Sequence, residues 1–157
     1  MAHEKTKPTS EITSILTGVA GEYFVAAELS QRGYIASITL RNTRGIDILA
    51  SNANASKQVG IQVKTNKYNK PVWLLNEKAE DYFAENLFYV FVCLKSLNEH
   101  PDFYVVPSVI VAKYIKRTHH EWLVTPGKRG QQRNDSSMRN FRDLDGKYKD
   151  KWKLLGL

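Results

Sequence analysis

The sequence lacks several features that would define its class. It has a single cysteine, Cys93, which lies within the apolar run 87–94 and is typical of a small buried side chain. One cysteine excludes a disulfide framework and a cysteine-rich metal site. No hydrophobic run approaches the length of a membrane span, and residues 1–10 are polar, unlike a signal peptide. We therefore expect a cytoplasmic protein with no membrane contact.

The chain also lacks internal repeats and low-complexity tracts, and its 157 residues suit one domain, 1–157, whose core needs no disulfides. Its formal net charge is +7, which favours an anionic partner. Residues 126–157 hold nine Lys and Arg against four Asp, so most of the excess lies there. Within this basic C-terminal loop and helix, residues 127–133 are typical either of a loop that follows a phosphate backbone or of a solvated tail.

Apolar residues in the first quarter recur at helical spacing. The pattern predicts a helix from Ser10, as N-cap, to Arg32, with Gly33 as its stop. Its apolar face would hold Ile12, Ile15, Leu16, Val19, Tyr23, Ala26, Ala27 and Ser30. Strands are expected at 34–40, 46–50, 58–65, 72–75, 87–94 and 103–106, and further helices at 77–85, 108–117 and 141–155. This order predicts a mixed α/β sheet flanked by helices, with Trp152 and Leu155 docking the last helix.

Polar residues interrupt two of the expected strands. Gln62 and Lys64 are two apart, so their side chains leave one face of the strand. Asp47 lies between Ile46 and Ile48, where a carboxylate would be costly to bury without a lysine or a cation beside it. If the two strands pair as a hairpin across 51–57, Asp47 falls beside Gln62 and Lys64.

A fourth polar residue borders the first helix. Glu22 follows Val19 by three positions and precedes Ala26 by four, so it can lean over the edge of the sheet and complete the cluster. Taken singly, each of these residues is more often an ordinary surface or capping group, and the prediction rests on their combination and order.

These residues resemble the PD-(D/E)XK phosphodiesterase superfamily, which has the restriction-endonuclease-like fold. The resemblance covers residues 10–94, as a nuclease-like core, and rests on Gly21-Glu22, Gly45-Ile46-Asp47 and Gln62-Val63-Lys64. It is nearest to the resolvase-like and Mrr-like branches, some of which also have glutamine in place of the second acid. The proline that often precedes the aspartate is replaced here by Ile46.

The resemblance implies a metal-dependent nuclease that cleaves DNA, as an endonuclease or a structure-selective resolvase. It assigns Mg²⁺ or Mn²⁺ to Asp47, the Gln62 side-chain oxygen and the Val63 carbonyl, all hard oxygen ligands. Lys64 would orient the attacking water and offset charge in the transition state. Glu22 would hold a metal-bound water or a second ion.

Partners follow from the same resemblance and from the charge. We expect DNA as substrate, a homodimer for cutting two strands, and partner proteins of a DNA-processing or defence system. The cations expected to contact nucleic acid are Arg44, Lys67, Lys70, Lys128, Arg129 and Arg133. Two alternatives stay open: an inactive nucleic-acid-binding subunit that kept the fold, and a protein-interaction module that uses the exposed sheet.

Overall fold

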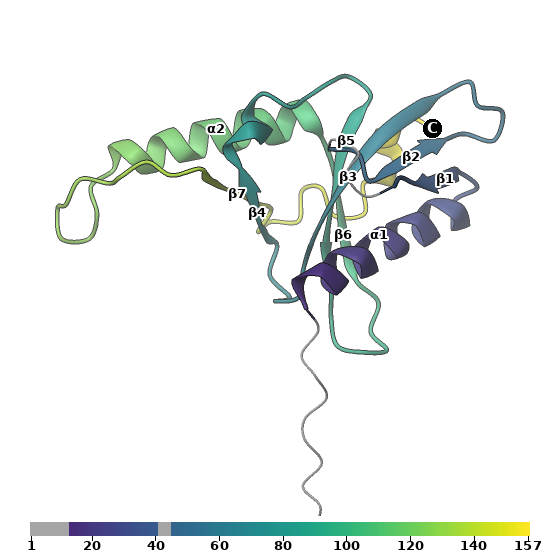
Figure 1. The fold of residues 1–157 in the computed structure, drawn as a ribbon, viewed down its shortest axis with the longest axis horizontal. Helices are drawn as coiled ribbons and strands as arrows, with labels where there is room; N and C mark the ends of the chain where they lie inside the picture. The colour runs from purple at the N-terminus through teal and green to yellow at the C-terminus, as the bar shows by residue number, and fades with distance from the viewer. Residues whose placement is uncertain (1–12, 41–44) are drawn as a thin grey trace, which may run out of the picture.

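The structure is a computed structural model that describes residues 13–40 and 45–157 (Figure 1). Thr13 caps the first helix, its hydroxyl accepting a hydrogen bond from the Leu16 N–H; the expected cap, Ser10, lies outside the described residues. The elements run in the order α1 (Ser14–Gln31), β1 (Ile35–Ile38), β2 (Ile48–Ser51), β3 (Gln58–Asn66), β4 (Val72–Asn76), the 3-10 helix η1 (Glu77–Glu80), β5 (Leu87–Cys93), β6 (Asp102–Pro107), α2 (Ser108–Val124), β7 (Met138–Arg142) and the 3-10 helix η2 (Trp152–Leu155).

The main sheet has five strands in the order β1-β2-β3-β5-β6. β1, β2 and β3 form an antiparallel meander, as the hairpin across 51–57 predicted. β5 then pairs parallel with β3, and β6 pairs antiparallel with β5. All seven residues of β5 are buried, because this strand lies between β3 and β6 and is covered on both faces.

Two apolar clusters lie on opposite faces of this sheet. On one face α1 and η2 contribute residues such as Val25, Leu29 and Trp152, which pack on β2, β3, β5 and β6. The docking predicted for Trp152 and Leu155 is confirmed, since each is 4% exposed. On the other face Trp73 and Phe141 pack with α2 on the alternate residues of β5 and β6. The fold therefore has three layers.

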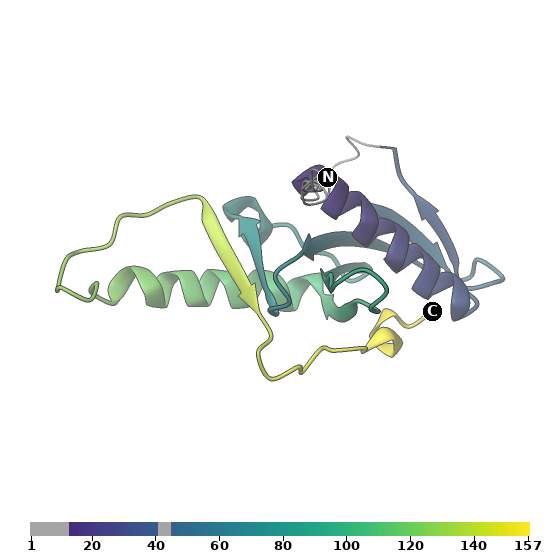
Figure 2. The ribbon, with the colours of Figure 1, turned by 90° about the horizontal axis from the view of Figure 1, so that it is seen from below.

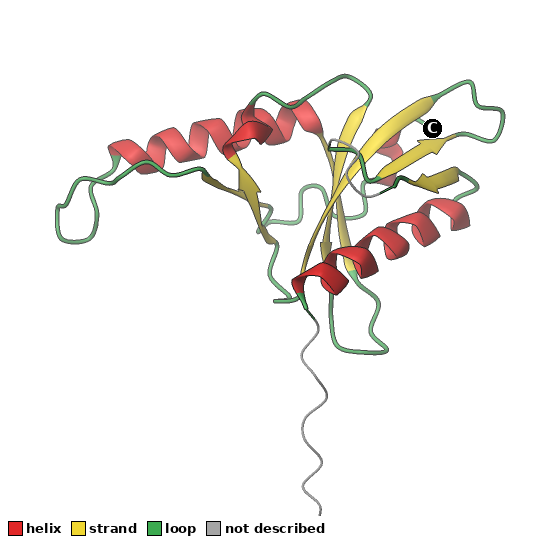
Figure 3. Cartoon of the chain, viewed as in Figure 1, coloured by secondary structure: helices red, strands yellow, loops and turns green. Residues whose placement is uncertain are grey.

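The third layer contains a second, two-stranded sheet. β4 pairs antiparallel with β7, more than sixty residues later in the chain, and we call this pair the ribbon. Figures 1 and 2 show the strands of the ribbon crossing α2, with α2 and the 125–137 loop extending away from the main sheet as an arm. On the opposite side of the sheet, α1 lies across β1 to β3, as the coloured elements of Figure 3 make plain.

Two predicted helices differ from the structure. The helix expected at 77–85 is only the single turn η1, because the Ser108 hydroxyl hydrogen-bonds both main-chain groups of Ala84 and holds that segment extended. The helix expected at 141–155 is absent from this fully described stretch. Phe141 belongs to β7, and the Asp143 carboxylate accepts the Lys147 N–H to close a turn, which leaves only η2 helical. α2, by contrast, continues seven residues past its expected end at 117.

The buried face of α1 was also predicted wrongly. Of the expected face, Ile15, Leu16 and Tyr23 are more than half exposed. The buried residues are instead Thr17, Gly21, Val25, Glu28 and Leu29. Gly21 sets this face, because a Cβ there would lie 1.8 Å from the Thr65 hydroxyl oxygen, so only glycine permits the approach to β3. Glu28 is buried because Arg32 and His100 pair with it.

Candidate active site

The site begins where β2 separates from β3. The last paired residues are Ile48 and Ile61, and Asp47 stands just before β2. Its N–H donates to the Ile61 carbonyl at 2.8 Å and its carbonyl accepts the Thr39 N–H at 2.9 Å, so its backbone is fixed on both sides. The Asp47 Oδ2 atom then accepts the Val63 N–H at 2.7 Å. The carboxylate thereby accepts a main-chain hydrogen bond from β3 that a neighbouring strand would otherwise accept.

Gln62 and Lys64 project from β3 into one cavity. This cavity has a volume of about 530 Å³ and is lined by both side chains together with Asn76, Lys78, Tyr82 and Tyr89. Tyr89 is the direct β5 neighbour of Gln62 in the parallel register, which places the two side chains next to each other. The predicted sharing of one face by Gln62 and Lys64 is confirmed, and that face opens toward the ribbon and η1.

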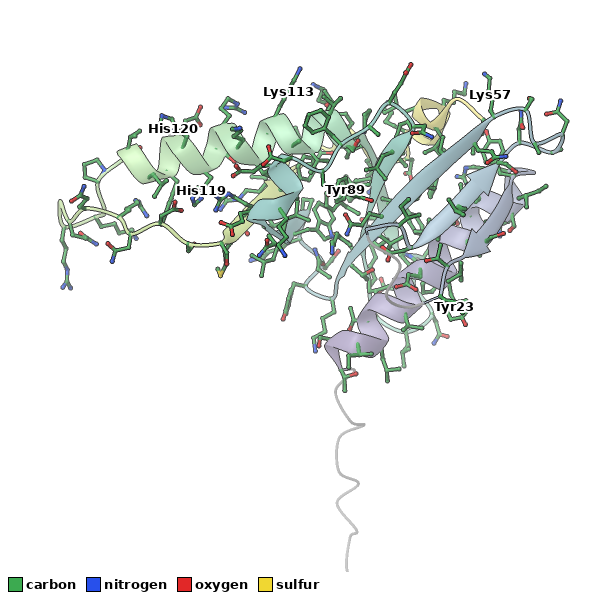
Figure 4. The ribbon with its side chains drawn as sticks, turned by 45° about the horizontal axis from the view of Figure 1, so that its top comes forward. Tyr23, Lys57, Tyr89, Lys113, His119 and His120 are labelled. Atoms are coloured by element: carbon green, nitrogen blue, oxygen red, sulfur yellow. The ribbon has the colours of Figure 1, made fainter. Side chains whose placement is uncertain are left out.

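Tyr89 of β5 lines this cavity from within the molecule (Figure 4). Its side chain is 1% exposed, and burial, followed by the neighbouring Tyr82 and Asp47, raises the pKa of Tyr89 to about 12. The hydroxyl is therefore uncharged at neutral pH and available as a hydrogen-bond donor. The contribution of Asp47 to this pKa places its carboxylate within electrostatic range of Tyr89.

Gly45 closes the cavity at the other side. It has φ of +65°, a backbone conformation that favours glycine, and a Cβ at this position would lie 2.5 Å from the Tyr82 ring. Tyr82 therefore packs directly on the peptide that leads to Asp47. The Gly45-Ile46-Asp47 segment owes its shape to this contact as well as to the pairing with β3.

A second cavity lies on the other side of Lys64. It has a volume of about 320 Å³, and its lining includes Lys64, Thr17, Lys67, Tyr68, Leu74 and Asn140. Lys64, which is half-buried, thus stands between two cavities. Tyr68 is 72% exposed and Trp73 2% exposed, so of the two aromatic residues near the lysine-rich turn only Tyr68 offers its ring to a ligand.

Glu22 is placed by α1 on the opposite face of the sheet from Gln62 and Lys64. It follows Gly21, which contacts Thr65 of β3, and it is half-buried. α1 approaches the edge of β3 to which Asp47 is hydrogen-bonded. Neither of the two cavities that Lys64 lines includes Glu22. Its membership of the cluster stays a prediction.

The donors for a divalent metal are mainly neutral. Among residues 13–40 and 45–157, no group of three or more His, Cys, Asp or Glu is arranged to hold a metal ion. The Asp47 carboxylate is close to Val63, whose carbonyl points to the same strand edge as its N–H, because both groups of a strand residue face one neighbour. With the Gln62 amide oxygen, these groups form a set of hard oxygen donors that fits Mg²⁺ or Mn²⁺.

The cations predicted to contact nucleic acid fall into three groups. Arg44 lies outside the described residues. Lys67 lines the second cavity, and Lys70 is exposed in the turn that follows β3. Lys128 and Arg129 are exposed in the arm loop, whereas the guanidinium of Arg133 stacks over Trp122 at 4.7 Å and donates to the Thr125 carbonyl.

The sequence did not reveal Tyr89, Asn76 or Asn140 as site residues. Tyr89 was taken for part of an apolar strand, although a tyrosine within such a run is a sign that a hydroxyl needs a polar neighbour. Asn76 and Asn140 belong to the ribbon, whose pairing has no local signal in the sequence.

The structure is similar to that of a bacterial homing endonuclease, I-Ssp6803I, with a TM-score of 0.53 and 15% identity over 93% of this chain and 94% of the other. It also matches Hjc, a Holliday junction resolvase from the archaeal hyperthermophile Archaeoglobus fulgidus, with a TM-score of 0.41 and 12% identity over 76% and 85%. No protein-family model and no curated protein matches the sequence. The first likeness confirms the predicted restriction-endonuclease-like fold and concerns the fold alone. Among the described residues, no helix combines the length and apolar character that crossing a membrane requires.

Proposed function

We propose that this protein is a metal-dependent DNA nuclease of the PD-(D/E)XK type with glutamine in place of the second acid. The observation that carries the proposal is the bond from the Val63 N–H to Asp47 Oδ2, which fixes a carboxylate at an open strand edge beside Gln62 and Lys64. The fold supports it, because the homing endonuclease of similar structure is by name an enzyme that cuts a nucleic acid.

Each residue has a role that its position allows. Lys64, between the two cavities, would orient the attacking water and offset negative charge on the phosphate as the bond breaks. Tyr89 would donate a hydrogen bond from a neutral hydroxyl. Asp47, Gln62 and the Val63 carbonyl would hold Mg²⁺ or Mn²⁺, with Glu22 at the edge of the site. A bound divalent ion supplies charge stabilisation and a more acidic water.

Cleavage of linear, branched and single-stranded DNA with Mg²⁺, Mn²⁺ or EDTA tests the proposal. We expect cleavage with either metal and none with EDTA. Lys64→Ala should reduce the rate on the order of a thousandfold, because a charge used in the transition state is lost. Activity that survives this substitution would refute the mechanism.

Asp47→Asn separates chemistry from structure. Asparagine keeps an oxygen for the Val63 N–H but removes the charge, so the melting temperature should change little while cleavage falls about a hundredfold or more.

If the wild-type protein binds DNA and never cuts it, the inactive-subunit alternative is correct. If it binds no DNA, the interaction-module alternative gains support. Sedimentation equilibrium with and without DNA measures the expected homodimer.

A further inference from the structure

The ribbon has an outer face on which five of the six residues are exposed. Along both strands burial alternates, with Trp73, Leu75, Arg139 and Phe141 inside. The outer face consists of three cross-strand pairs, Val72 with Arg142, Leu74 with Asn140, and Asn76 with Met138. Leu74 is 58% exposed and Met138 55% exposed. An antiparallel ribbon commonly has one solvated face.

The chemistry of this face differs from that of the arm loop. Its six residues include two amides, three apolar side chains and one arginine, but no lysine and no carboxylate. Phosphate contacts are usually made by cations, as Lys128 and Arg129 would make them in the loop. Asparagine pairs with adenine and arginine with guanine in the major groove, where apolar side chains meet the thymine methyl group. The face therefore matches base edges better than phosphates.

The same face adjoins the site of the proposed chemistry. Leu74 and Asn140 line the 320 Å³ cavity that Lys64 also lines, and Asn76 lines the cavity that contains Gln62. Asn140 further borders a cavity of about 290 Å³ between β7 and α2, lined by Met138, Arg142 and Trp122 among others. A duplex with one phosphate at Lys64 would consequently lie against the ribbon.

The ribbon is also held in place before any ligand binds. The Trp73 indole N–H donates to the Val92 carbonyl at 3.0 Å, which anchors β4 on β5. Arg139 pairs with Glu80 beneath β7 and donates to the Ser136 carbonyl at 2.6 Å. Such fixation lowers the entropy lost on binding and suits an element that distinguishes one base from another.

We propose that the outer face of the ribbon enters the DNA major groove and reads base edges through Asn140 and Arg142, giving this nuclease a sequence preference. The inference rests on the proposed function for its substrate. A two-stranded antiparallel ribbon has the width that the major groove admits.

Selection from a pool of duplexes with a randomised central segment tests this inference. The bound fraction is sequenced in EDTA, and the cut fraction in Mn²⁺, for the wild type and for Asn140→Ala and Arg142→Ala. The wild type should select particular bases, and each variant should lose about tenfold to a hundredfold of preference at its own position. Asn140→Asp, which turns an amide donor into an acceptor, should change the preferred base. Asn54→Ala, in the β2–β3 turn, is the control and should keep the wild-type preference.

The outcomes separate this inference from the proposed function. If the wild type cuts the pool without base preference, the nuclease stands and the inference fails. Base selection in EDTA without cleavage in Mn²⁺ supports the inference and refutes the nuclease. Ribbon variants that select like Asn54→Ala overturn the inference, as do variants that change only the mass in solution, because the face would then be a contact between copies.

Discussion

The main sheet and the ribbon both pack aromatic residues inside, but they differ in how many faces they bury. β5 is covered on both faces, whereas β3 is covered on one face and carries the half-buried Gln62 and Lys64 on the other. The ribbon buries one face and exposes the other. A substitution on the open ribbon face should therefore change binding with little effect on folding, whereas one at Gln62 or Lys64 should change the proposed chemistry.

The difference also concerns charge. The site in the main sheet has one carboxylate bonded to β3 and a neutral glutamine, so the metal binding that we propose there would depend on what the substrate adds. The exposed cations of the arm loop lie far along the chain from Asp47, at Lys128 and Arg129. The proposed cleavage site and the cations that would attract DNA thus lie in different regions of the chain, and each can be altered separately.

The largest expected effect concerns Gln62. Gln62→Leu is similar in size but has no oxygen, so cleavage should fall on the order of a thousandfold, while Gln62→Glu adds a charge and should keep cleavage and tighten metal binding. In the wild type, Mn²⁺ affinity should rise when DNA is present, because phosphate oxygens complete the coordination. Cleavage against Mn²⁺ concentration, and calorimetric titration of Mn²⁺ into the protein with and without uncut DNA, measure both.

The matched control is Gln58→Leu, an exposed residue of the same strand. It should leave cleavage and Mn²⁺ binding as in the wild type. Equal cleavage by Gln62→Leu and Gln58→Leu would make Gln62 an ordinary surface residue and the proposed metal site wrong.

The next effect compares the two faces of the ribbon. Phe141 is 1% exposed and stacks on Phe91 with ring centroids 4.6 Å apart, so Phe141→Ala should cost about 3–5 kcal/mol of unfolding free energy. Leu74→Ala, on the open face, should cost less than about 1 kcal/mol. Urea unfolding followed by circular dichroism gives both values. Similar losses for both variants would mean that the outer face is covered in solution.

Most of the main sheet could be predicted because its signals are local. The hairpin of β2 and β3 joins neighbouring segments, and the alternation around Gln62 and Lys64 follows from strand geometry. The ribbon could not be predicted, since β4 pairs with residues 138–142 and nothing near β4 specifies that partner. Phe141 was accordingly assigned to a helix.

The α1 face could not be predicted for a different reason. Hydrophobic spacing favours Ile15, Leu16 and Tyr23, yet the contact with β3 is decided by the absence of a side chain at Gly21. The buried Glu28 depends on Arg32, one turn later, and on His100, which is distant in sequence. Periodicity detects apolar residues and cannot detect a close approach or a distant ionic partner.

A smaller effect tests that correction. Val25 is fully buried and Tyr23 is 65% exposed on the outer side of α1, where Figure 4 shows it pointing away from the sheet. Val25→Ala should lower the unfolding free energy by about 1–3 kcal/mol, and Tyr23→Ala by less than about 0.5 kcal/mol. Thermal and urea unfolding at several protein concentrations measure the two. A larger loss for Tyr23→Ala would mean that the hydrophobic spacing identified the buried face after all.

The smallest expected effect lies in the arm loop, where the charges that would attract DNA differ in their surroundings. Lys128 and Arg129 are exposed, and their turn is closed by main-chain hydrogen bonds from Gly127 to Gln131 and from Gly130 to Gly127, so it does not need those side chains. Each phosphate contact contributes about −0.9 to the slope of log affinity against log salt. The double variant Lys128→Ala, Arg129→Ala should therefore flatten the slope by about two and weaken binding equally for all sequences. Arg133→Ala should change the slope less, because its guanidinium already donates to Thr125 and stacks on Trp122.

Lys57→Ala, in the β2–β3 turn away from the arm (Figure 4), is the control for loss of a single charge. Fluorescence anisotropy with labelled duplexes from about 50 to 200 mM salt covers the range in which such slopes are measured. A double variant with the slope of the Lys57→Ala protein would show that the loop is a solvated turn and that DNA is attracted elsewhere.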